Sequence, residues 1–359
     1  MPKRILVIED SFVFQRIMTE TLQGLAPGAV IDVAGSAAEG LAKAGRGGPD
    51  IVFLDLVLPD QDGLGLLAQL RGLSPAPAVI VVSGTGDHQA GGTVRALELG
   101  ALEFVAKPVN AGYQASVEIL GRDLGRAIAA WREHGAARTD AAARGIAAPA
   151  APPSLPAPPA RRSGFWVTAV ASSTGGPEAL MKLLSALPAE YPLPIVVVQH
   201  MPPLFTESLA RSIDQHSALT VCEGRDGMAL APGRVYLAPG GRHMTVVAPR
   251  GLPEILLTDA PPECNVRPAA DVLFRSLARI REARGVLAVV MTGMGDDGRE
   301  GVRCLKARSA HCVAQSRESC VVYGMPRAVV DAGLADEIVD LDDLAGRLTV
   351  LAGLPAFSR

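Results

Sequence analysis

The stretch FWVTAVASSTGGPEAL, residues 165–180, decides the fold of the larger part of this 359-residue chain. The apolar run Trp166–Ala171 predicts a buried strand. Pro177 is typical of the first turn of a helix, where its missing N–H costs nothing. Gly175 and Gly176 permit a tight turn between the two. The stretch therefore predicts a strand, a turn and a helix in direct succession.

The same alternation continues towards the C-terminus. Further apolar runs predict strands at Ile195–Gln199 and Val286–Met291, and helices are expected to begin near Asp271 and Asp297. Strands that alternate with helices indicate a parallel sheet covered on both faces.

A segment of different composition precedes this region. Residues 135–162 are mostly Ala, Pro and Arg and include PAAPPSLPAPP at 149–159. Such a segment has too little bulky apolar surface for a core, and its prolines favour extended conformers. We predict an interdomain linker over residues 126–163 that begins as a helix. It separates a domain at 1–125 from a domain at 164–355.

The N-terminal part also alternates strand and helix signals. Its strand-like runs are Arg4–Ile8, Val30–Ala34, Asp50–Leu54, Ala78–Val82 and Leu102–Ala106. The fold class predicted for the whole chain is therefore α/β, with two doubly wound parallel-sheet domains.

Composition and charge exclude several classes of protein. Apolar residues make up 48% of the chain and the formal net charge is −3, which argues against a general nucleic-acid binder. No apolar run reaches the roughly 18 residues that span a bilayer, and the N-terminus lacks a signal peptide. The five cysteines show no CxxC spacing, so we expect buried free thiols and neither a zinc site nor disulfides. A cytoplasmic protein without membrane insertion is expected.

Polar residues stand at the carboxyl ends of the N-terminal strands: Glu9, Asp10, Asp55, Ser83 and Lys107. In a doubly wound sheet these ends meet at one crevice. Three carboxylates close together favour a hard divalent cation such as Mg²⁺, and the lysine and the hydroxyl could contact a phosphoryl group. The alternative is that each polar residue only caps its strand.

The motifs IED (8–10), LDLVLPDQDG (54–63), VVSG (81–84) and FVAKP (104–108) resemble a response-regulator receiver domain, which has a flavodoxin-like fold. The resemblance implies that Asp55 accepts a phosphoryl group from a histidine kinase. It also implies roles for the remaining residues: Mg²⁺ bound by Glu9, Asp10, Asp55 and the carbonyl of Val57, and phosphoryl contacts from Ser83 and Lys107.

The turn after Ala171 offers a candidate nucleophile. Residues 171–175 approximate the G-x-S-x-G elbow with Ser173 in the reactive position, although Ala171 replaces the first glycine. The alternatives are a turn that binds phosphate or that has no ligand. No Walker lysine follows, which argues against a nucleotide.

A nucleophilic serine needs a base and an orienting acid. His200 follows the strand Ile195–Gln199 at the same sheet edge and is the leading base, with His243 as second choice. Asp296 and Asp297, in the glycine-rich loop after the strand Val286–Met291, are both candidate acids.

Six pieces of the C-terminal region resemble the catalytic domain of the chemotaxis protein-glutamate methylesterases, the CheB family: SSTGGPEAL, VVVQHMPPLFTESLA, VYLAPGGRHM, RPAADVLFRSLA, VVMTGMGDDGREG and SCVVYGMP. The resemblance implies Ser173 as nucleophile, His200 as base, Asp297 as acid and the N–H of Met294 as oxyanion donor. The N–H of Thr174 is a second candidate donor.

The implied substrate is a glutamate γ-methyl ester on the cytoplasmic helices of methyl-accepting chemoreceptors. Hydrolysis would release methanol without a catalytic metal, and specific glutamines would be deamidated by the same route. We expect the receiver to inhibit this activity until Asp55 is phosphorylated. Two other functions stay open: an adaptor that binds receptor helices without turnover, and a DNA-binding output, for which no helix-turn-helix is found.

Overall fold

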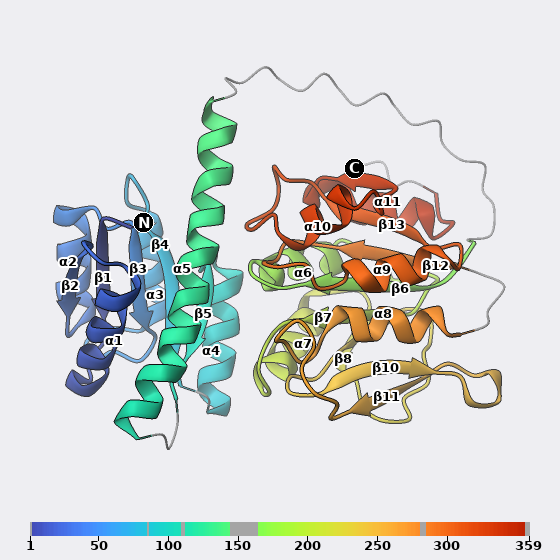
Figure 1. The fold of residues 1–359 in the computed structure, drawn as a ribbon, viewed down its shortest axis with the longest axis horizontal. Helices are drawn as coiled ribbons and strands as arrows, with labels where there is room; N and C mark the ends of the chain where they lie inside the picture. Colours follow the sequence, from blue (N-terminus) through green and yellow to red (C-terminus); the bar gives the residue numbers. More distant parts are fainter. Residues whose placement is uncertain (1, 85, 109–111, 144–163, 281–284, 356–359) are drawn as a thin grey trace. The chain divides into compact units, whose positions relative to one another are not determined.

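In the computed structural model, which describes residues 2–84, 86–108, 112–143, 164–280 and 285–355, the N-terminal strands form one parallel sheet (Figure 1). The strand order is β2-β1-β3-β4-β5, which is the flavodoxin-like order. Its strands are β1 (Arg4–Ile8), β2 (Val30–Ala34), β3 (Ile51–Asp55), β4 (Ala78–Ser83) and β5 (Glu103–Ala106). The sequence-based prediction of a doubly wound sheet is confirmed for this region.

Helices cover both faces of this first sheet. They are α1 (Phe12–Leu25), α2 (Ala37–Gly47), α3 (Gly63–Arg71), α4 (Asp87–Glu98) and α5 (Tyr113–Ala143). Helices α2, α3 and α4 contact one another in sequence, whereas α1 lies against α5, where Gly121 is next to Thr21. Strand β3 is consequently buried along its whole length.

Helix α5 is longer than the composition suggests. It continues through residues 135–143, which we assigned to the Ala-rich and Pro-rich segment. Alanine has the highest helix propensity, so an Ala-rich stretch extends an existing helix until proline prevents it. Residues 144–163, the remainder of the predicted linker, lie outside the described residues.

The C-terminal region forms a second parallel sheet of seven strands in the order β14-β13-β12-β6-β7-β9-β8. The strands are β6 (Phe165–Ser172), β7 (Ile195–Gln199), β8 (Thr220–Glu223), β9 (Arg234–Leu237), β12 (Gly285–Val290), β13 (His311–Gln315) and β14 (Glu337–Val339). Chain order reverses between β6 and β12. Ligands of open α/β sheets bind at such a switch point, beyond the carboxyl ends of the strands.

Two groups of helices enclose this second sheet. The first group is α6 (Gly176–Ser185), α7 (Phe205–His216) and α11 (Leu341–Leu351). The second group is α8 (Ala270–Ala278), α9 (Arg299–Lys306) and α10 (Met325–Asp331). The buried β6 residues Val167, Ala169 and Ala171 form a core with Phe274 of α8.

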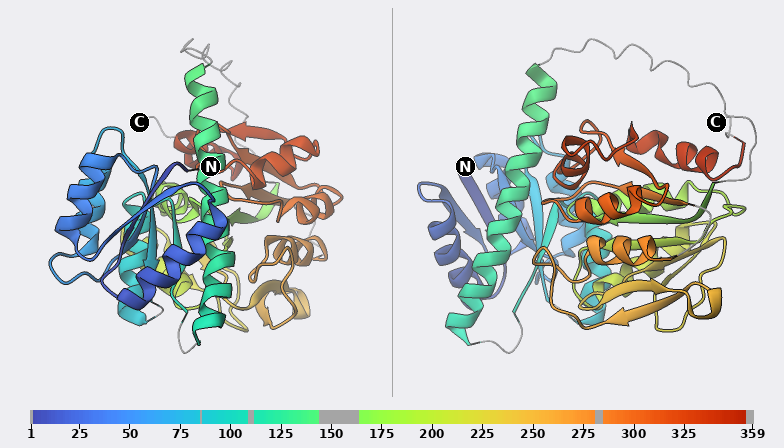
Figure 2. Two further views of the ribbon diagram at one scale, coloured as in Figure 1. Left: turned by 60° about the vertical axis from the view of Figure 1, so that its left-hand side comes forward. Right: turned by 45° about the vertical axis from the view of Figure 1, so that its right-hand side comes forward.

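An antiparallel hairpin that the sequence analysis did not anticipate packs on α8 (Figure 2). It consists of β10 (His243–Val247) and β11 (Glu254–Thr258), joined through a short 3₁₀ turn at Pro249–Gly251. The hairpin supplies Met244, Val246 and Ile255 to the core.

The structure also bears on two further expectations, the lack of a membrane-spanning helix and the burial of the cysteines. Within the described ranges, no helix is both long and apolar enough to cross a bilayer. All five cysteines are free, but the expectation of burial is confirmed only for Cys312 and Cys320, because Cys222 is half-buried and Cys264 and Cys304 are exposed.

Candidate active site

Two adjacent serines at the end of β6 have different environments. Ser172 is fully buried, and its hydroxyl donates to Oε1 of Gln199 at 2.7 Å. Ser173 is half-buried, lies just beyond the strand and is held by its backbone N–H, which donates to the carbonyl of Thr292 at 3.0 Å. Of these two serines, only Ser173 is therefore partly exposed at the switch point.

Glycines allow the close approach of chain segments around Ser173. Gly175 has a φ of +75° and begins helix α6. A Cβ on Gly176 would lie 1.9 Å from Oε1 of Gln199, and a Cβ on Gly293 would lie 2.7 Å from Cβ of Ser173. Larger residues at these positions would displace Gln199 or Ser173.

Strand register places His200 beside Ser173. Ser172 pairs with Gln199 in the parallel ladder between β6 and β7, so Ser173 and His200 are the next residues on neighbouring strands. The backbone N–H of His200 donates to the carbonyl of Ser172 at 3.2 Å. The side chain of Gln199 ties both loops together, because its Nε2 donates to the carbonyls of Ser173 and His200.

The imidazole of His200 is paired with a buried carboxylate. Its Nε2 lies 2.8 Å from Oδ2 of Asp297, and both side chains are almost fully buried. Two backbone N–H groups at the start of α8, those of Ala270 and Asp271, also donate to Asp297, at 2.6 and 2.9 Å. An ionised carboxylate only accepts hydrogen bonds, so Nε2 carries the proton and Nδ1 keeps the lone pair.

The electrostatics of Asp297 favour its ionised form. Burial by itself would raise the pKa of this carboxyl, but the hydrogen bond and charge of His200, with the two N–H groups of α8, lower the pKa below its ordinary value. Asp297 thus provides a fixed negative charge next to His200.

The structure distinguishes between the alternatives that the sequence left open. Asp296 is exposed and pairs with Arg299 at 3.0 Å, so it does not face His200. His243 is completely buried, and both of its ring nitrogens are engaged by backbone groups of other residues. Neither residue shares the position of the His200–Asp297 pair.

The loop after β12 places Met294 close to the serine. Gly293 contacts Ser173, and Met294 follows it directly. Within the described part of the chain, the Met294 N–H donates no backbone hydrogen bond. Thr174 is buried, and its carbonyl accepts a hydrogen bond from Oγ1 of Thr292 at 2.9 Å. Both predicted oxyanion donors therefore belong to loops that meet at Ser173.

Three supporting residues were missed in the sequence. Thr292 is fully buried and joins three segments: its Oγ1 donates to Thr174 and accepts from the N–H of Val322, and its own N–H donates to Gln315. Gln199 and Gln315 are likewise buried at strand ends. A single polar residue that ends an otherwise apolar strand is the signal that could have identified them.

The first sheet carries a separate acidic site at its own carboxyl edge. Ligand oxygens of Glu9, Asp10 and Asp55 lie within 4.8 Å of one another. Nζ of Lys107 lies 2.6 Å from both Glu9 and Asp55, and Ser83 is buried at the end of β4. Val57 is exposed, and its N–H donates to Asp55 at 3.1 Å. The structure thus gathers the predicted residues at one edge.

Burial and charge act against each other at this edge. Desolvation raises the pKa of Glu9, which the nearby Lys107 only partly offsets. Desolvation would lower the pKa of Lys107, but the charges of Glu9 and Asp55 prevail and raise it. Oε2 of Glu9 is buried, and the partner that the described residues give it is Nζ of Lys107 at 2.6 Å. A hard cation that prefers oxygen ligands fits this arrangement.

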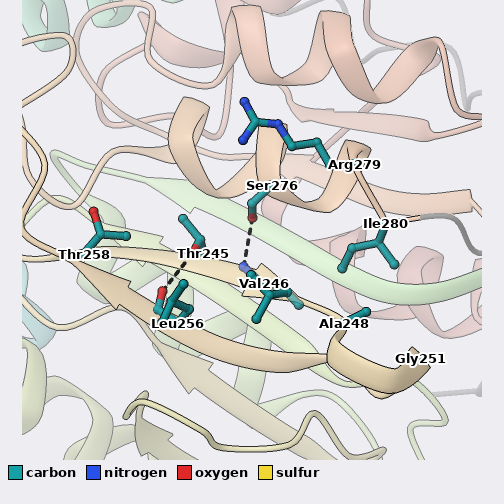
Figure 3. A pocket seen from close by; sticks show the side chains of 10 residues that line it. Thr245, Val246, Ala248, Gly251, Leu256, Thr258, Ser276, Arg279 and Ile280 are labelled. Carbon is teal, nitrogen blue, oxygen red and sulfur yellow. Dashed lines mark hydrogen bonds between the residues drawn. The ribbon is translucent and has the colours of Figure 1, made fainter.

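A cavity of about 680 Å³ lies elsewhere, between the hairpin and the C-terminal half of α8 (Figure 3). Its lining is mostly apolar and includes Val246, Leu256 and Ile280. Ser276 joins hairpin and helix there, since its Oγ accepts from the N–H of Val246 at 2.9 Å. None of the predicted site residues lines this cavity.

Together, the two units define a class of protein in which a receiver-type α/β domain accompanies an α/β domain with a hydrolase-type site. Comparisons with known proteins agree. The family described as CheB methylesterase matches residues 168–348, and the response regulator receiver domain matches residues 5–113.

A protein of Oleidesulfovibrio alaskensis named "Protein-glutamate methylesterase/protein-glutamine glutaminase 1" is 38% identical over 95% of this chain and 97% of its own length. A Geobacillus kaustophilus protein of the same name without the number is 38% identical over 98% and 99%. The crystal structure of the Thermotoga maritima CheB methylesterase catalytic domain shares 41% identity and a TM-score of 0.50, and it covers 51% of this chain and 97% of that one. The chain belongs to the CheB methylesterase family and carries a response-regulator receiver domain.

Proposed function

We propose that this chain hydrolyses glutamate γ-methyl esters on the cytoplasmic helices of chemoreceptors and releases methanol. The observation that carries the proposal is the pairing of His200 with Asp297 beside the partly accessible Ser173. The names of relatives that match nearly the full chain support the substrate class.

The proposed reaction is derived from the hydrogen bond between His200 and Asp297. Nε2 of His200 is committed to Asp297, so Nδ1 takes the proton from Oγ of Ser173 as the oxygen attacks the ester carbonyl. The positive imidazole is then stabilised by the ionised Asp297. The N–H groups of Met294 and Thr174 are the donors proposed for the tetrahedral oxyanion.

Collapse of this intermediate expels methoxide, which leaves as methanol with the proton from His200. Water, deprotonated by the same imidazole, attacks the acyl-enzyme and regenerates Ser173 with a free glutamate. A glutamine side chain passes through an equivalent intermediate with ammonia as the leaving group, and this accounts for the glutaminase part of the relatives' name. The proposed hydrolysis uses these side chains and no metal.

The receiver domain would control this reaction by phosphorylation of Asp55, with a histidine kinase as phosphodonor. Glu9, Asp10, Asp55 and the carbonyl of Val57 would hold Mg²⁺, whose charge offsets that of the incoming phosphoryl group. Ser83 and Lys107 would contact the phosphoryl oxygens. The reaction is proposed to occur in the cytoplasm, where the receptor helices are accessible.

Methanol release from methylated receptor by the full-length, phosphodonor-treated protein tests the proposal. Ser173→Ala should lower kcat by roughly 10³-fold or more, because the nucleophile is lost. Ser172→Ala is the matched control, since its buried hydroxyl only supports Gln199, and we expect a decrease of less than about tenfold. Wild-type turnover in Ser173→Ala would refute the assigned nucleophile, and wild-type protein without methanol release would favour the adaptor.

A further inference from the structure

We infer that the turn formed by residues 239–243, PGGRH, positions the proposed catalytic pair, with His243 as its central positioning residue. The inference rests on the proposed function. The motif supplies none of the catalytic groups assigned above, and this turn has contacts on both of its sides.

The hydrogen bonds of His243 fix its tautomer. The side chain is fully buried, and its Nδ1 lies 3.1 Å from the backbone N–H of Ala269, which can only donate. Its Nε2 lies 3.1 Å from the carbonyl of Pro261, which can only accept. The ring is therefore neutral, with its proton on Nε2. It lacks a free nitrogen and cannot act as the base.

The partner of Nδ1 lies at the start of helix α8. Ala269 is the N-cap of α8, and its methyl side chain cannot bind the free N–H groups of the first turn. Side chains from elsewhere do so instead. His243 accepts from residue 269, and Asp297 accepts from residues 270 and 271.

A continuous chain of hydrogen bonds follows. It runs from His243 to the first turn of α8, from there to the carboxylate of Asp297, and on to Nε2 of His200. Oδ2 of Asp297 accepts from both Ala270 and His200. A shift of the helix start would thus move the oxygen that orients the base.

The other side of the turn contacts the loop that carries His200. A Cβ on Gly240 would lie 2.2 Å from the carbonyl carbon of Pro202, two residues after His200. The N–H of Gly240 donates to Oγ1 of Thr206, and the N–H of Gly241 donates to the carbonyl of Arg267. The turn is therefore clamped between the His200 loop and the segment that leads into α8.

The position of this turn therefore affects the positions of Asp297 and His200, on which the reaction rate depends. A misplacement of about 1 Å at a reacting group can lower the rate on the order of 10²-fold. If His243 only filled the core, its replacement would reduce the folded fraction and leave the properties of the folded enzyme unchanged.

Two amide variants of the full-length protein separate these roles. Asn places an oxygen near the position of Nδ1 and can accept from Ala269, whereas Gln places its amide near Nε2 and cannot reach Ala269. We expect His243→Asn to retain kcat within about threefold and His243→Gln to lose about 30-fold, with KM within about twofold in both. Thr245→Val is the control, because Thr245 lies on the same strand as His243 and the change removes a hydrogen bond to the carbonyl of Leu256 on β11.

The pH profile supplies the second readout. A displaced Asp297 stabilises the positive form of His200 less, so the acidic limb of kcat/KM in His243→Gln should move to lower pH by roughly half a unit. Asp271, Asp296 and Cys264 also lie near Asp297 but are unchanged in both variants. Equal kcat values and identical pH profiles for the Asn and Gln variants would overturn the inference.

Spectroscopy keeps the inference testable if a variant fails to fold. In the ¹⁵N spectrum of the wild-type imidazoles at pH 7.5, His243 should show the neutral form protonated on Nε2, and any other form contradicts the inference. The proton between His200 and Asp297 should shift in His243→Gln and stay in place in His243→Asn, whatever the substrate. This readout is independent of turnover, so a failed methylesterase assay and a failed positioning role are distinguishable.

Discussion

The two carboxylate sites show how similar sheet edges give different chemistry. In the first sheet, the buried Oε2 of Glu9 lies 2.6 Å from the ammonium of Lys107 and accepts no backbone N–H among the described residues. In the second sheet, Asp297 accepts from His200 and from two backbone N–H groups. A carboxylate whose oxygens have few hydrogen-bond donors keeps lone pairs that can bind an exchangeable cation. A carboxylate whose oxygens accept several hydrogen bonds is fixed in orientation and charge.

Asp297→Asn changes the fixed site most strongly and has the largest expected effect. Asn has one acceptor oxygen, which can keep the bond from the N–H of Asp271, and its NH2 group then faces Ala270 and His200, where it cannot accept the Nε2 proton. We expect kcat for methanol release to fall on the order of 10³- to 10⁴-fold with the fold intact.

Asp296→Asn is the matched control for this change. Its side chain is exposed and paired with Arg299, so kcat should stay within about twofold of wild type. Comparable losses in the two variants would show that the loop as a whole, and not the carboxylate at position 297, is required.

Asp55→Asn changes the acidic site of the first sheet and should affect only the regulation of the esterase activity. Without a carboxylate at this position, a small phosphodonor can no longer raise activity, and coupling between sites of this kind is typically worth about 5- to 150-fold. Basal methanol release should be unchanged in the variant. The measurement is the initial rate with and without phosphodonor in the full-length protein.

Asp60→Asn provides the comparison within the same loop. Asp60 accepts from the N–H groups of Ala37 and Ala38 and takes no part in the acidic cluster. The Asp60→Asn variant should still show increased methanol release when the phosphodonor is added. Activation that persists in Asp55→Asn would remove the assigned phosphorylation site.

The extent of prediction from sequence also differs between parts of the molecule. Ser173 and His200 could be placed together because each follows an apolar strand, and carboxyl ends of parallel strands share one edge. The motifs of both domains gave the family, which the comparisons confirm. Local patterns therefore sufficed wherever the strand end itself supplied the functional side chain.

Features that depend on distant pairing were not visible in the sequence. The β10–β11 hairpin packs on a helix that follows it in the chain, and the partners of His243 and Asp297 are N–H groups of that helix. A backbone N–H carries no residue-specific signal. The exposure of Cys264 likewise depends on the surrounding loop, where both Cys264 and Asn265 have positive φ.

Asp271 extends the comparison, because it is a buried carboxylate with fewer hydrogen bonds than Asp297. It accepts from the N–H of Gly301 at 2.6 Å, yet burial, with a further contribution from the charge of Asp297, raises its pKa to about 6. The folded protein therefore binds this proton more tightly than the unfolded chain. The contribution of the protonated Asp271 to the free energy of unfolding is fully present at low pH and is lost as the pH rises through about 6.

Asp271→Asn removes the free-energy cost of ionising this buried carboxyl and keeps an oxygen that can accept from Gly301. Its expected effect is the smallest of those considered and is limited to stability. At pH 7.5 the variant should melt about 2 °C above the wild type, and at about pH 3, below the ordinary pKa of an aspartate, the difference should vanish, as measured by thermal unfolding of the full-length protein. Asp343→Asn, in the exposed first turn of α11, should give no increase, because an acid there is favourable to the helix dipole. A gain that is equal at both pH values would mean that packing, and not ionisation, limits stability at residue 271. In that case the contrast between Asp271, whose ionised form is destabilised by burial, and Asp297, whose ionised form is stabilised by hydrogen bonds, would be wrong.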